Sequence, residues 1–424
     1  MGASGHEMRG EARLSGAAWA TLIAALLGWL FDGFEMGLFP VVAPAALGDM
    51  LGLAENPSRA SEVAPLIGRI TAAFLVGAAA GGVVFGWLGD RIGRVRSLSF
   101  SILTYSLFTG LGAFARTPFE LGATRFVAAL GMGGEWSLGV ALIMECWPAK
   151  HRPLLAGVIG AAANAGLLLV AAIGRAFPVR PESWRWMFLV GALPALLVFF
   201  VRLAVPESQA WQRATKERKA APLRELFAGG LARPALLALA FASIPLIGTW
   251  AVAQWAVPAW VERLTGGEQP GAKGEVAMLW AIGAVLGSLA APIAGARIGR
   301  RPAYFALCVL SLASTSFLFL ANDAYDATMR ASAVMCGATT AAFYGWLPLY
   351  LPELFPTRVR ATGQGLAFNL GRIFAAAGAI GGGELVRVFG NDYPRAGATM
   401  SSIYALGLVL IWFAPETRGR PLPE

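Results

Sequence analysis

The sequence predicts an all-α integral membrane protein of twelve transmembrane helices, arranged as two six-helix repeats. Of its 424 residues, 57% are hydrophobic and only 14% are charged, whereas a soluble domain carries about 25% charged residues. Apolar stretches of roughly twenty residues recur along the chain, and each is long enough to cross a hydrocarbon core of about 30 Å. Landmarks of the first half return in the second half after 206 to 209 residues. These observations indicate a duplicated membrane bundle.

Each apolar stretch is expected to form one helix. We expect helices at residues 17–47, 66–88, 98–115, 118–146, 153–176, 184–204, 236–262, 275–296, 302–321, 328–351, 361–386 and 396–414. The first stretch is too long for the core of a signal peptide, and no cleavage site of small residues follows it. We therefore interpret it as the first transmembrane helix.

One long polar segment, residues 206–234, divides the chain and is rich in basic side chains. We expect a cytoplasmic N-terminal tail at 1–16 and an N-terminal six-helix bundle at 17–205. The polar segment is expected to be a cytoplasmic linker. A C-terminal six-helix bundle is expected at 235–414, and a cytoplasmic C-terminal tail at 415–424.

The basic residues lie in the loops between apolar stretches. With the N-terminus placed in the cytoplasm, the segments expected inside carry 21 of the 34 Lys and Arg residues, and those expected outside carry 11. This bias agrees with the positive-inside rule. We therefore expect a multi-pass protein of the cell inner (plasma) membrane with both termini in the cytoplasm. The net charge of +9 is explained by these loops and gives no reason to expect a nucleic-acid partner.

Three landmarks repeat in one register. The segment from Gly86 to Arg94 is matched by Gly295 to Arg301. The other pairs are Glu145 and Arg152 with Glu353 and Arg360, and Pro206-Glu207-Ser208 with Pro415-Glu416-Thr417. Duplicated halves are typical of proteins in which one half rocks against the other around a central site. Ala296 stands where the first half has Asp90, so we expect the two loops to contribute unequally to gating.

These landmarks resemble the signatures of the major facilitator superfamily, and the resemblance covers the chain from Trp19 onward. The motifs that carry it are Gly86 to Arg94 after the second helix, Arg125 with Gly131, Gly133 and Gly134 in the fourth helix, and Pro206-Glu207-Ser208 and Pro415-Glu416-Thr417-Arg418-Gly419 after the sixth and twelfth helices. The last two resemble the sugar-porter-like branch. Gly131 to Trp136 also looks like the sialate and monocarboxylate proton symporters. Asp32 to Glu35 is similar to the aromatic-acid proton symporters.

In this family, the loop motif closes the cytoplasmic side through contacts between Asp and Arg. The resemblance therefore implies a cytoplasmic gate formed by Gly86, Asp90, Arg91, Gly93, Arg94, Glu145, Arg152, Glu353 and Arg360. Positive-inside signalling alone would explain the arginines but not the paired glutamates.

Charged residues inside the expected helices need a reason, because a charge at the bilayer centre costs about 2.5–3.5 kcal/mol. A rise of 1.5 Å per residue places Asp32 and Arg125 at nearly the same depth, so we expect them to form an ion pair. The corresponding pair in sugar-porter relatives couples protons, and a static ion pair is the alternative. We expect proton coupling to involve Asp32, Arg125 and Glu135, although Glu135 could instead make an intracellular contact. Glu35, one turn above Asp32, could snorkel to water.

Arg372 is the sharpest candidate for binding a substrate. It is expected at the midplane of the eleventh helix, where its guanidinium could hold a carboxylate in a two-point fork. One alternative is an arginine that caps carbonyl groups where this glycine-rich helix breaks, and another is that its partner is an acid of another helix, such as Asp32. Other side chains could line a half-polar, half-aromatic cavity around it: Asn369, Asn164, Gln254, Trp250 and Tyr344.

The leading hypothesis is a secondary active transporter that carries a small organic anion together with protons by alternating access. The alternatives are a neutral solute (sugar) carrier, a drug-type exporter and, from another class, a membrane sensor that does not transport. The sequence has no nucleotide-binding Gly-Lys-Ser/Thr loop after a strand, no metal-ligand spacing and no nucleophile–base pair. We therefore expect no enzyme activity and no cofactor, with a proton gradient as the energy source. The expected partners are the substrate, protons and the lipid bilayer, and we expect the protein to be a monomer.

Overall fold

The structure is a computed structural model that describes residues 16–217, 222–227, 230–250, 257–266, 268–269 and 271–424. The described part consists of helices joined by turns and irregular segments, and it contains no strand. The prediction of an all-α protein is therefore confirmed.

The first half contains five continuous helices and one interrupted span. They are α1 (Gly16–Met50), α2 (Ala60–Ile92), α3 (Arg94–Gly112), α4 (Pro118–Cys146), α5 (Arg152–Ala176), and the pair α6 (Arg185–Gly191) and α7 (Ala195–Ala204). Two short helices lie in the linker, α8 (Gln209–Glu217) and α9 (Pro222–Phe227).

The second half repeats this plan with more interruptions. Its helices are α10 (Ala232–Ile247), α11 (Val257–Leu264), α12 (Ala272–Ile298), α13 (Arg300–Leu320), α14 (Ala327–Thr340), α15 (Phe343–Tyr350), α16 (Arg360–Val388), α17 (Tyr393–Ser401) and α18 (Ile403–Leu410). Single 3₁₀ turns occupy Pro57–Arg59, Ala149–His151, Leu351–Leu354, Thr357–Val359 and Ile411–Phe413.

The expectation of continuous helices was wrong for the sixth and tenth spans. The sixth breaks before Pro194, whose ring nitrogen cannot donate a hydrogen bond to the preceding turn. The tenth breaks between α14 and α15, and the Ser288 hydroxyl of α12 donates to the Ala341 carbonyl at the break (3.0 Å). The twelfth has a one-residue turn at Ser402 between α17 and α18, but it still forms one span from Tyr393 to Phe413. Eight described helices are long and apolar enough to cross a membrane, and the twelfth span at Tyr393–Phe413 is one of them.

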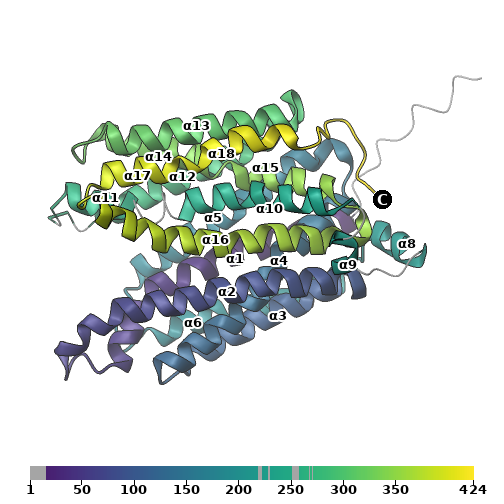
Figure 1. The fold of residues 1–424 in the computed structure, drawn as a ribbon. Coiled ribbons are helices and arrows are strands. Elements are labelled where there is room, and N and C mark those ends of the chain that lie inside the picture. Colours follow the sequence, from purple (N-terminus) through teal and green to yellow (C-terminus); the bar gives the residue numbers. More distant parts are fainter. Residues whose placement is uncertain (1–15, 218–221, 228–229, 251–256, 267, 270) are drawn as a thin grey trace, which may run out of the picture.

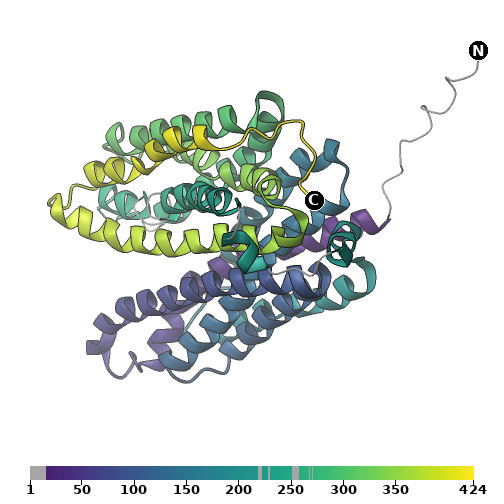
Figure 2. The same ribbon diagram turned by 45° about the vertical axis from the view of Figure 1, so that its right-hand side comes forward.

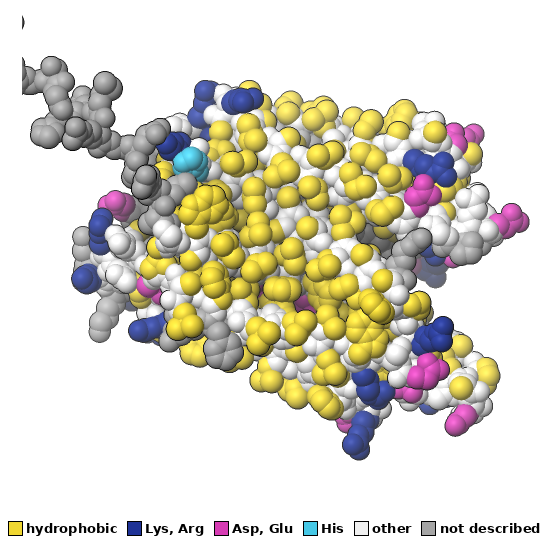
Figure 3. Space-filling model, turned by 180° about the vertical axis from the view of Figure 1, so that it is seen from behind, with side chains coloured by type: hydrophobic (Ala, Val, Ile, Leu, Met, Phe, Trp, Pro, Cys, Tyr) yellow, Lys and Arg dark blue, Asp and Glu magenta, His cyan; other side chains and the backbone are white. Residues whose placement is uncertain are grey.

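The two halves form two bundles that lie side by side (Figure 1). The linker helices α8 and α9, the start of α1 and the C-terminal tail all lie at one end of the bundles (Figure 2). We call this the linker end. Figure 3 shows hydrophobic side chains across the middle of the face in view, with charged side chains gathered toward its two ends. It also shows a notch between the two lobes at the end remote from the linker. Such a band is what a membrane-embedded surface requires.

The halves meet where α2 packs on α16 and α5 packs on α12. Glycines bring these backbones together, since a Cβ on Gly82 would lie 2.0 Å from the Asn369 Nδ2. A Cβ on Gly365 would lie 2.2 Å from the Gly82 carbonyl oxygen, and one on Gly160 would lie 2.4 Å from the Tyr344 carbonyl oxygen. Small residues at helix crossings allow this close approach in membranes.

We predict that Gly82→Ala destabilises this arrangement, because the added methyl group overlaps Asn369 and overpacking costs about 1–3 kcal/mol. Gly68→Ala in the same helix is the matched control, since nothing lies within 4 Å of its added Cβ. Thermal unfolding of the purified protein in detergent should show a lower midpoint for Gly82→Ala alone. Equal midpoints for the two variants would contradict the close contact of α2 with α16.

Candidate functional site

A buried ion pair lies within the first half of the chain. Glu35 of α1 accepts a hydrogen bond at Oε1 from Arg125 Nη1 of α4. The same oxygen accepts a second hydrogen bond, of 2.6 Å, from the Thr109 hydroxyl of α3. The guanidinium of Arg125 also lies over the ring of Phe74, with its Cζ 4.8 Å from the ring centroid. Arg125 and Glu35 therefore join three helices of one bundle.

A second ion pair crosses between the halves. Asp32 Oδ2 of α1 lies 3.7 Å from Arg372 Nη2 of α16, and both side chains are buried. This distance is that of an ion pair rather than a hydrogen bond. Among the described residues, neither Asp32 oxygen nor Arg372 Nη1 has a hydrogen-bond partner. Arg372 therefore keeps an unused donor beside an acid of the opposite bundle.

The expected pair of Asp32 with Arg125 was wrong. Arg125 forms an ion pair with Glu35, and Asp32 forms one with Arg372. The two acids lie on successive turns of α1, about 4.5 Å apart along the helix axis. A comparison of depths counted from the ends of two helices cannot resolve that difference, because each end is uncertain by one or two residues and the two errors add to as much as about 6 Å. Glu35 is buried and does not snorkel to water.

Several buried polar atoms where the halves meet have no hydrogen-bond partner among the described residues. They are both oxygens of Asp32 and of Glu135, both amide atoms of Gln364, the indole nitrogens of Trp29 and Trp136, Asn369 Oδ1 and Arg372 Nη1. Most buried polar groups in proteins are paired. An unpaired set drawn from α1, α4 and α16 therefore marks a place for a polar ligand or for ordered water.

Aromatic rings from both halves pack within this region. Phe368 of α16 stacks on Trp136 of α4, with ring centroids 4.1 Å apart and planes at 17°. Trp29 of α1 lies 6.0 Å from both rings. Tyr344 of α15 lies 6.4 Å from Phe368. The Arg372 Cζ is 5.3 Å from the Phe368 ring centroid, so the arginine lies directly above the aromatic layer.

Sequence reasoning missed Trp29, Trp136, Gln364 and Phe368 as members of this site. The signal available was the spacing of Gln364, Phe368 and Arg372, which are four residues apart and so lie on one face of α16. The two tryptophans gave no such signal, because aromatic residues are common in membrane helices.

The other candidate substrate contacts are spread more widely. Asn369 donates to the Gly133 carbonyl of α4 at 2.9 Å, so its amide ties the two halves together. Asn164 is buried and donates at 3.4 Å to the Gly160 carbonyl of its own helix. Trp250 packs against the main hydrophobic cluster at the end of α10. Gln254 lies outside the described residues.

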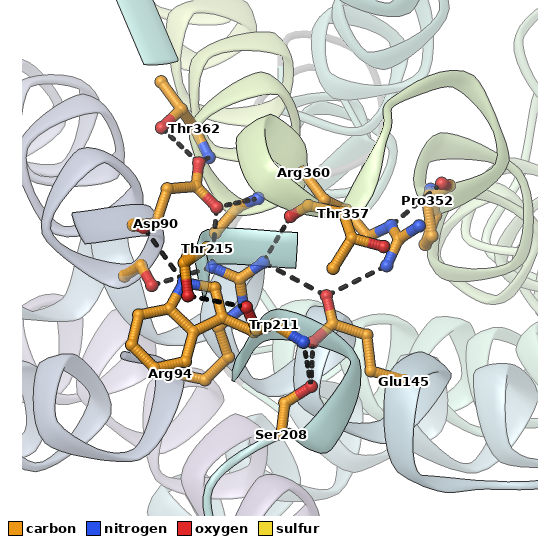
Figure 4. A network of polar contacts seen from close by, with 12 residues as sticks. Asp90, Arg94, Glu145, Ser208, Trp211, Thr215, Pro352, Thr357, Arg360 and Thr362 are labelled. Atoms are coloured by element: carbon orange, nitrogen blue, oxygen red, sulfur yellow. Dashed lines mark hydrogen bonds and ion pairs between the residues drawn. The ribbon is translucent and has the colours of Figure 1, made fainter. Parts of the chain in front are cut away.

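At the linker end, a polar network joins the halves (Figure 4). Arg94 of α3 donates to Asp90 at 2.6 Å and to Glu145 at 3.1 Å, both within the first half. It also donates to the Thr357 carbonyl of the second half at 2.6 Å. Glu145 accepts a further hydrogen bond of 2.9 Å from Arg360 Nη1 of α16. The expected gate residues Asp90, Arg94, Glu145 and Arg360 are therefore one contact group.

Asp90 also holds the N-terminus of α16. Its carboxylate accepts hydrogen bonds from the Thr362 backbone N–H (2.8 Å), the Thr362 hydroxyl (2.5 Å) and the Ala361 N–H (3.3 Å). The first N–H groups of a helix have no partner inside the helix and attract negative charge. A carboxylate of the first half thus caps the N-terminus of a helix of the second half.

The second half repeats the contacts within a half but not the direct ion pair between the halves. Arg300 donates to Glu353 at 2.6 and 3.0 Å, as Arg94 does to Glu145. Arg152, the counterpart of Arg360, donates to the Trp147 carbonyl at 3.3 Å, and Glu353 of the second half acts on it electrostatically without a direct ion-pair contact. Ala296, the counterpart of Asp90, has no carboxylate. The described ion pairs across the halves at this end therefore lie on the α2–α16 side, as the substitution at Ala296 led us to expect.

The remaining expected gate residues have separate roles. A Cβ on Gly86 would lie 2.7 Å from the Ala361 carbonyl oxygen, so this glycine permits close packing. Gly93 has a positive φ of 112°, which favours glycine. Burial raises the pKa of Glu207, although its carboxylate accepts backbone hydrogen bonds beside Gly93. Arg91 stacks on Trp87 (4.8 Å) and takes no part in the polar network.

The linker and the C-terminal tail reinforce this network in a way that sequence reasoning did not predict. The Ser208 hydroxyl donates to Glu145, and the Trp211 indole donates to the Asp90 carbonyl at 2.9 Å. In the tail, the Pro423 carbonyl accepts from Arg360 Nη2 at 2.7 Å. Ser208 belongs to a repeated landmark, but neither it, Trp211 nor the Pro423 carbonyl carried a sequence signal for these particular partners.

A buried arginine–acid pair between two bundles, closed at one end by a polar network, is the arrangement of a carrier that exposes its centre to one side at a time. The chain belongs to the Major Facilitator Superfamily, which matches residues 21–379. It is therefore a membrane transport protein with the twelve-helix, two-repeat fold, and not an enzyme.

The chain is similar to named transporters along most of its length. It is 32% identical over 408 residues to the "Probable 4-methylmuconolactone transporter" of Cupriavidus pinatubonensis, covering 94% of this chain and 91% of that protein. It is 30% identical to the cis,cis-muconate transport protein of Acinetobacter baylyi, covering 74% and 76%.

Solved structures share the fold at lower identity. The human organic anion transporter MFSD10 superposes with a TM-score of 0.75 at 17% identity, covering 93% of this chain and 99% of that chain. The proton:xylose symporter XylE superposes with a TM-score of 0.74 at 21% identity, covering 97% and 98%.

We predict that Arg360→Gln loosens the linker end, because it removes the ion pair with Glu145 across the halves. Arg152→Gln is the matched control at the equivalent place in the repeat. The thiol of Cys146, partly buried beside Glu145, reports the change through its rate of labelling by a maleimide. Labelling should be several times faster in Arg360→Gln and close to wild type in Arg152→Gln. Equal rates in both variants, with folding verified by gel filtration, would show that this ion pair does not hold the end closed.

Proposed function

We propose that the protein is a proton-coupled symporter that moves a small organic anion by alternating access. The observation that carries this proposal is Arg372, a buried guanidinium at the meeting of the halves with one donor nitrogen unpaired. The names of the relatives, which include transporters of muconate and of 4-methylmuconolactone, support an organic acid.

Arg372 is the proposed anchor for the substrate carboxylate. A guanidinium presents two parallel N–H donors to a carboxylate, and this pairing is strong away from water. The neighbouring ring of Phe368, with those of Trp136 and Tyr344, supplies an apolar wall for the rest of the substrate. The amide of Gln364 is an unpaired polar group on the same face of α16. Asn369, Asn164, Gln254 and Trp250 remain proposed contacts around this centre.

Asp32 couples the anion to a proton because the Asp32 carboxylate and the substrate carboxylate compete for Arg372. In the described state the arginine neutralises Asp32. When a substrate carboxylate occupies the guanidinium, Asp32 becomes a buried acid without its cation. Burial disfavours the charged form of an unpaired acid, so Asp32 takes up a proton. Anion and proton then cross together. Arg125 acts through Glu35, by holding α1 against α4 and so fixing the position of Asp32.

The described state is closed at the linker end, and Figure 3 shows its notch at the other end. In the proposed cycle, the bundles 17–205 and 235–414 rock about the centre. The network of Asp90, Arg94, Glu145 and Arg360 separates when the linker end opens. The distribution of Lys and Arg supports placing that end, the tails 1–16 and 415–424 and the linker 206–234 in the cytoplasm, with the protein in the inner (plasma) membrane. The proposed unit is a monomer driven by the proton gradient without a cofactor.

A neutral solute carrier is the second candidate, and one observation favours it. Arg372 already has a counter-charge in Asp32, so a neutral substrate such as a sugar would leave the pair intact. The two candidates differ in what Arg372 does. For an anion the guanidinium touches the substrate, and for a neutral solute it only balances Asp32.

For an anion carrier, we predict that Arg372→Lys retains folding but weakens binding of the transported acid about 10- to 100-fold. The lysine keeps the charge but loses the second hydrogen bond, and hydrogen bonds to charged groups contribute about 1.5–3 kcal/mol. Arg387→Lys on the same helix is the control, since that side chain is exposed. Binding is measured by calorimetry on purified protein against a panel of acids and sugars. Wild-type affinity for an acid in Arg372→Lys, or a sugar as the best ligand, would contradict the anchor.

The coupling role of Asp32 generates a separate prediction. Asp32→Asn cannot exchange a proton, so accumulation of the acid against its gradient should be lost while exchange of labelled for unlabelled acid continues. The measurement is uptake into proteoliposomes with and without an inward proton gradient. Accumulation by Asp32→Asn at the wild-type level would exclude Asp32 as the coupling group.

A further inference from the structure

A third buried acid, Glu135, lies apart from both ion pairs. It is on α4, ten residues and so about 15 Å nearer to the linker end than Arg125. Its side chain is 3% exposed, and neither oxygen has a hydrogen-bond partner among the described residues. No described Lys, Arg or His side chain lies within ion-pair distance of it. It packs against α1, where a Cβ on Gly28 would lie 2.1 Å from its Oε1.

Glu135 borders a small cavity with room for about one water molecule. The cavity is lined by Ala25, Trp29, Glu135, Trp136, Gly139, Val140 and Ile159. The indole nitrogens of Trp29 and Trp136 are also unpaired. One unpaired acid and two tryptophans with unpaired indole N–H groups therefore line a space that a single water can occupy.

The titratable groups around Glu135 give it no counter-charge. Asp32 of α1 and Tyr105 of α3 are the groups that interact with it electrostatically. On α2 no titratable residue lies between Arg69 and Asp90, and on α5 none lies between Arg152 and Arg175. On α16 the one charged residue at this level is Arg372, which faces Asp32.

The buried charges do not balance if every acid is ionised. Away from the polar contacts at the linker end, the buried charged residues of the described part are three acids, Asp32, Glu35 and Glu135, and two arginines, Arg125 and Arg372. Each arginine is occupied by one acid. An ionised Glu135 would leave one uncompensated negative charge in an apolar interior, which is costly. The neutral acid avoids this cost and can donate a hydrogen bond to the cavity.

We infer that Glu135 holds a second transported proton, so that each cycle moves two protons with one substrate anion. This deepens the proposed function and rests on it. Glu135 adjoins Trp136, whose ring stacks on Phe368 of the other half. Opening of the linker end separates that stack and lets water reach Glu135, which releases its proton there. For a monocarboxylate, two protons and one anion carry one net positive charge inward.

The charge state of Glu135 can be measured without a substrate. Infrared spectra of the reconstituted protein at neutral pH should contain the carbonyl band of a protonated carboxylic acid. The band should be absent in Glu135→Gln and retained in Glu135→Asp and Asp32→Asn. A spectrum of Glu135→Gln that matches wild type in this region would overturn the inference, because it would show that Glu135 is ionised.

The stoichiometry is tested with labelled 4-methylmuconolactone, a monocarboxylate, in proteoliposomes. An inside-negative potential, imposed by potassium and valinomycin at equal pH, should stimulate uptake severalfold in wild type and not in Glu135→Gln. Uptake that responds to a pH gradient but not to this potential would refute the second proton and leave the one-proton symporter standing.

Discussion

A buried arginine must find a negative partner, and the architecture of this protein is arranged around how Arg372 meets that need. Its partner Asp32 comes from the other half of the chain, at an ion-pair distance that leaves a guanidinium nitrogen unused. The pair joins the bundles and yet is incomplete. A substrate carboxylate that binds Arg372 therefore weakens the ion pair with Asp32. Because an unpaired buried acid takes up a proton, this competition couples binding of the anion to uptake of a proton.

The polar network at the linker end shows which contacts the two repeated halves share and which they do not. Arg94 with Glu145 and Arg300 with Glu353 are the same local contact built twice. The crossing exists only where Asp90 supplies a carboxylate to the first N–H groups of α16. The loss of that carboxylate at Ala296 leaves α5 and α12 held by packing within the described structure. One side of the linker end is thus joined by direct ion pairs, and the other by packing with a longer-range interaction between Arg152 and Glu353.

Much of this was predictable from sequence, because the membrane imposes strong constraints. Apolar length located the spans, the repeated landmarks gave the two halves, and the cost of a buried charge singled out Arg372. What failed depended on distances smaller than one helical turn, such as the choice of Arg125 between Asp32 and Glu35. The aromatic layer of Trp136 and Phe368 and the carbonyl of Pro423 were not predicted, since they arise from tertiary packing between distant segments.

The most direct test of the competition for Arg372 is the number of protons taken up when the substrate binds. Calorimetric titration of the purified protein in buffers of different ionisation enthalpy gives that number. If the carboxylate displaces Asp32 from Arg372, binding at neutral pH should take up close to one proton in wild type, and that uptake should vanish in Asp32→Asn. Binding of the acid with no proton uptake in wild type would contradict the account.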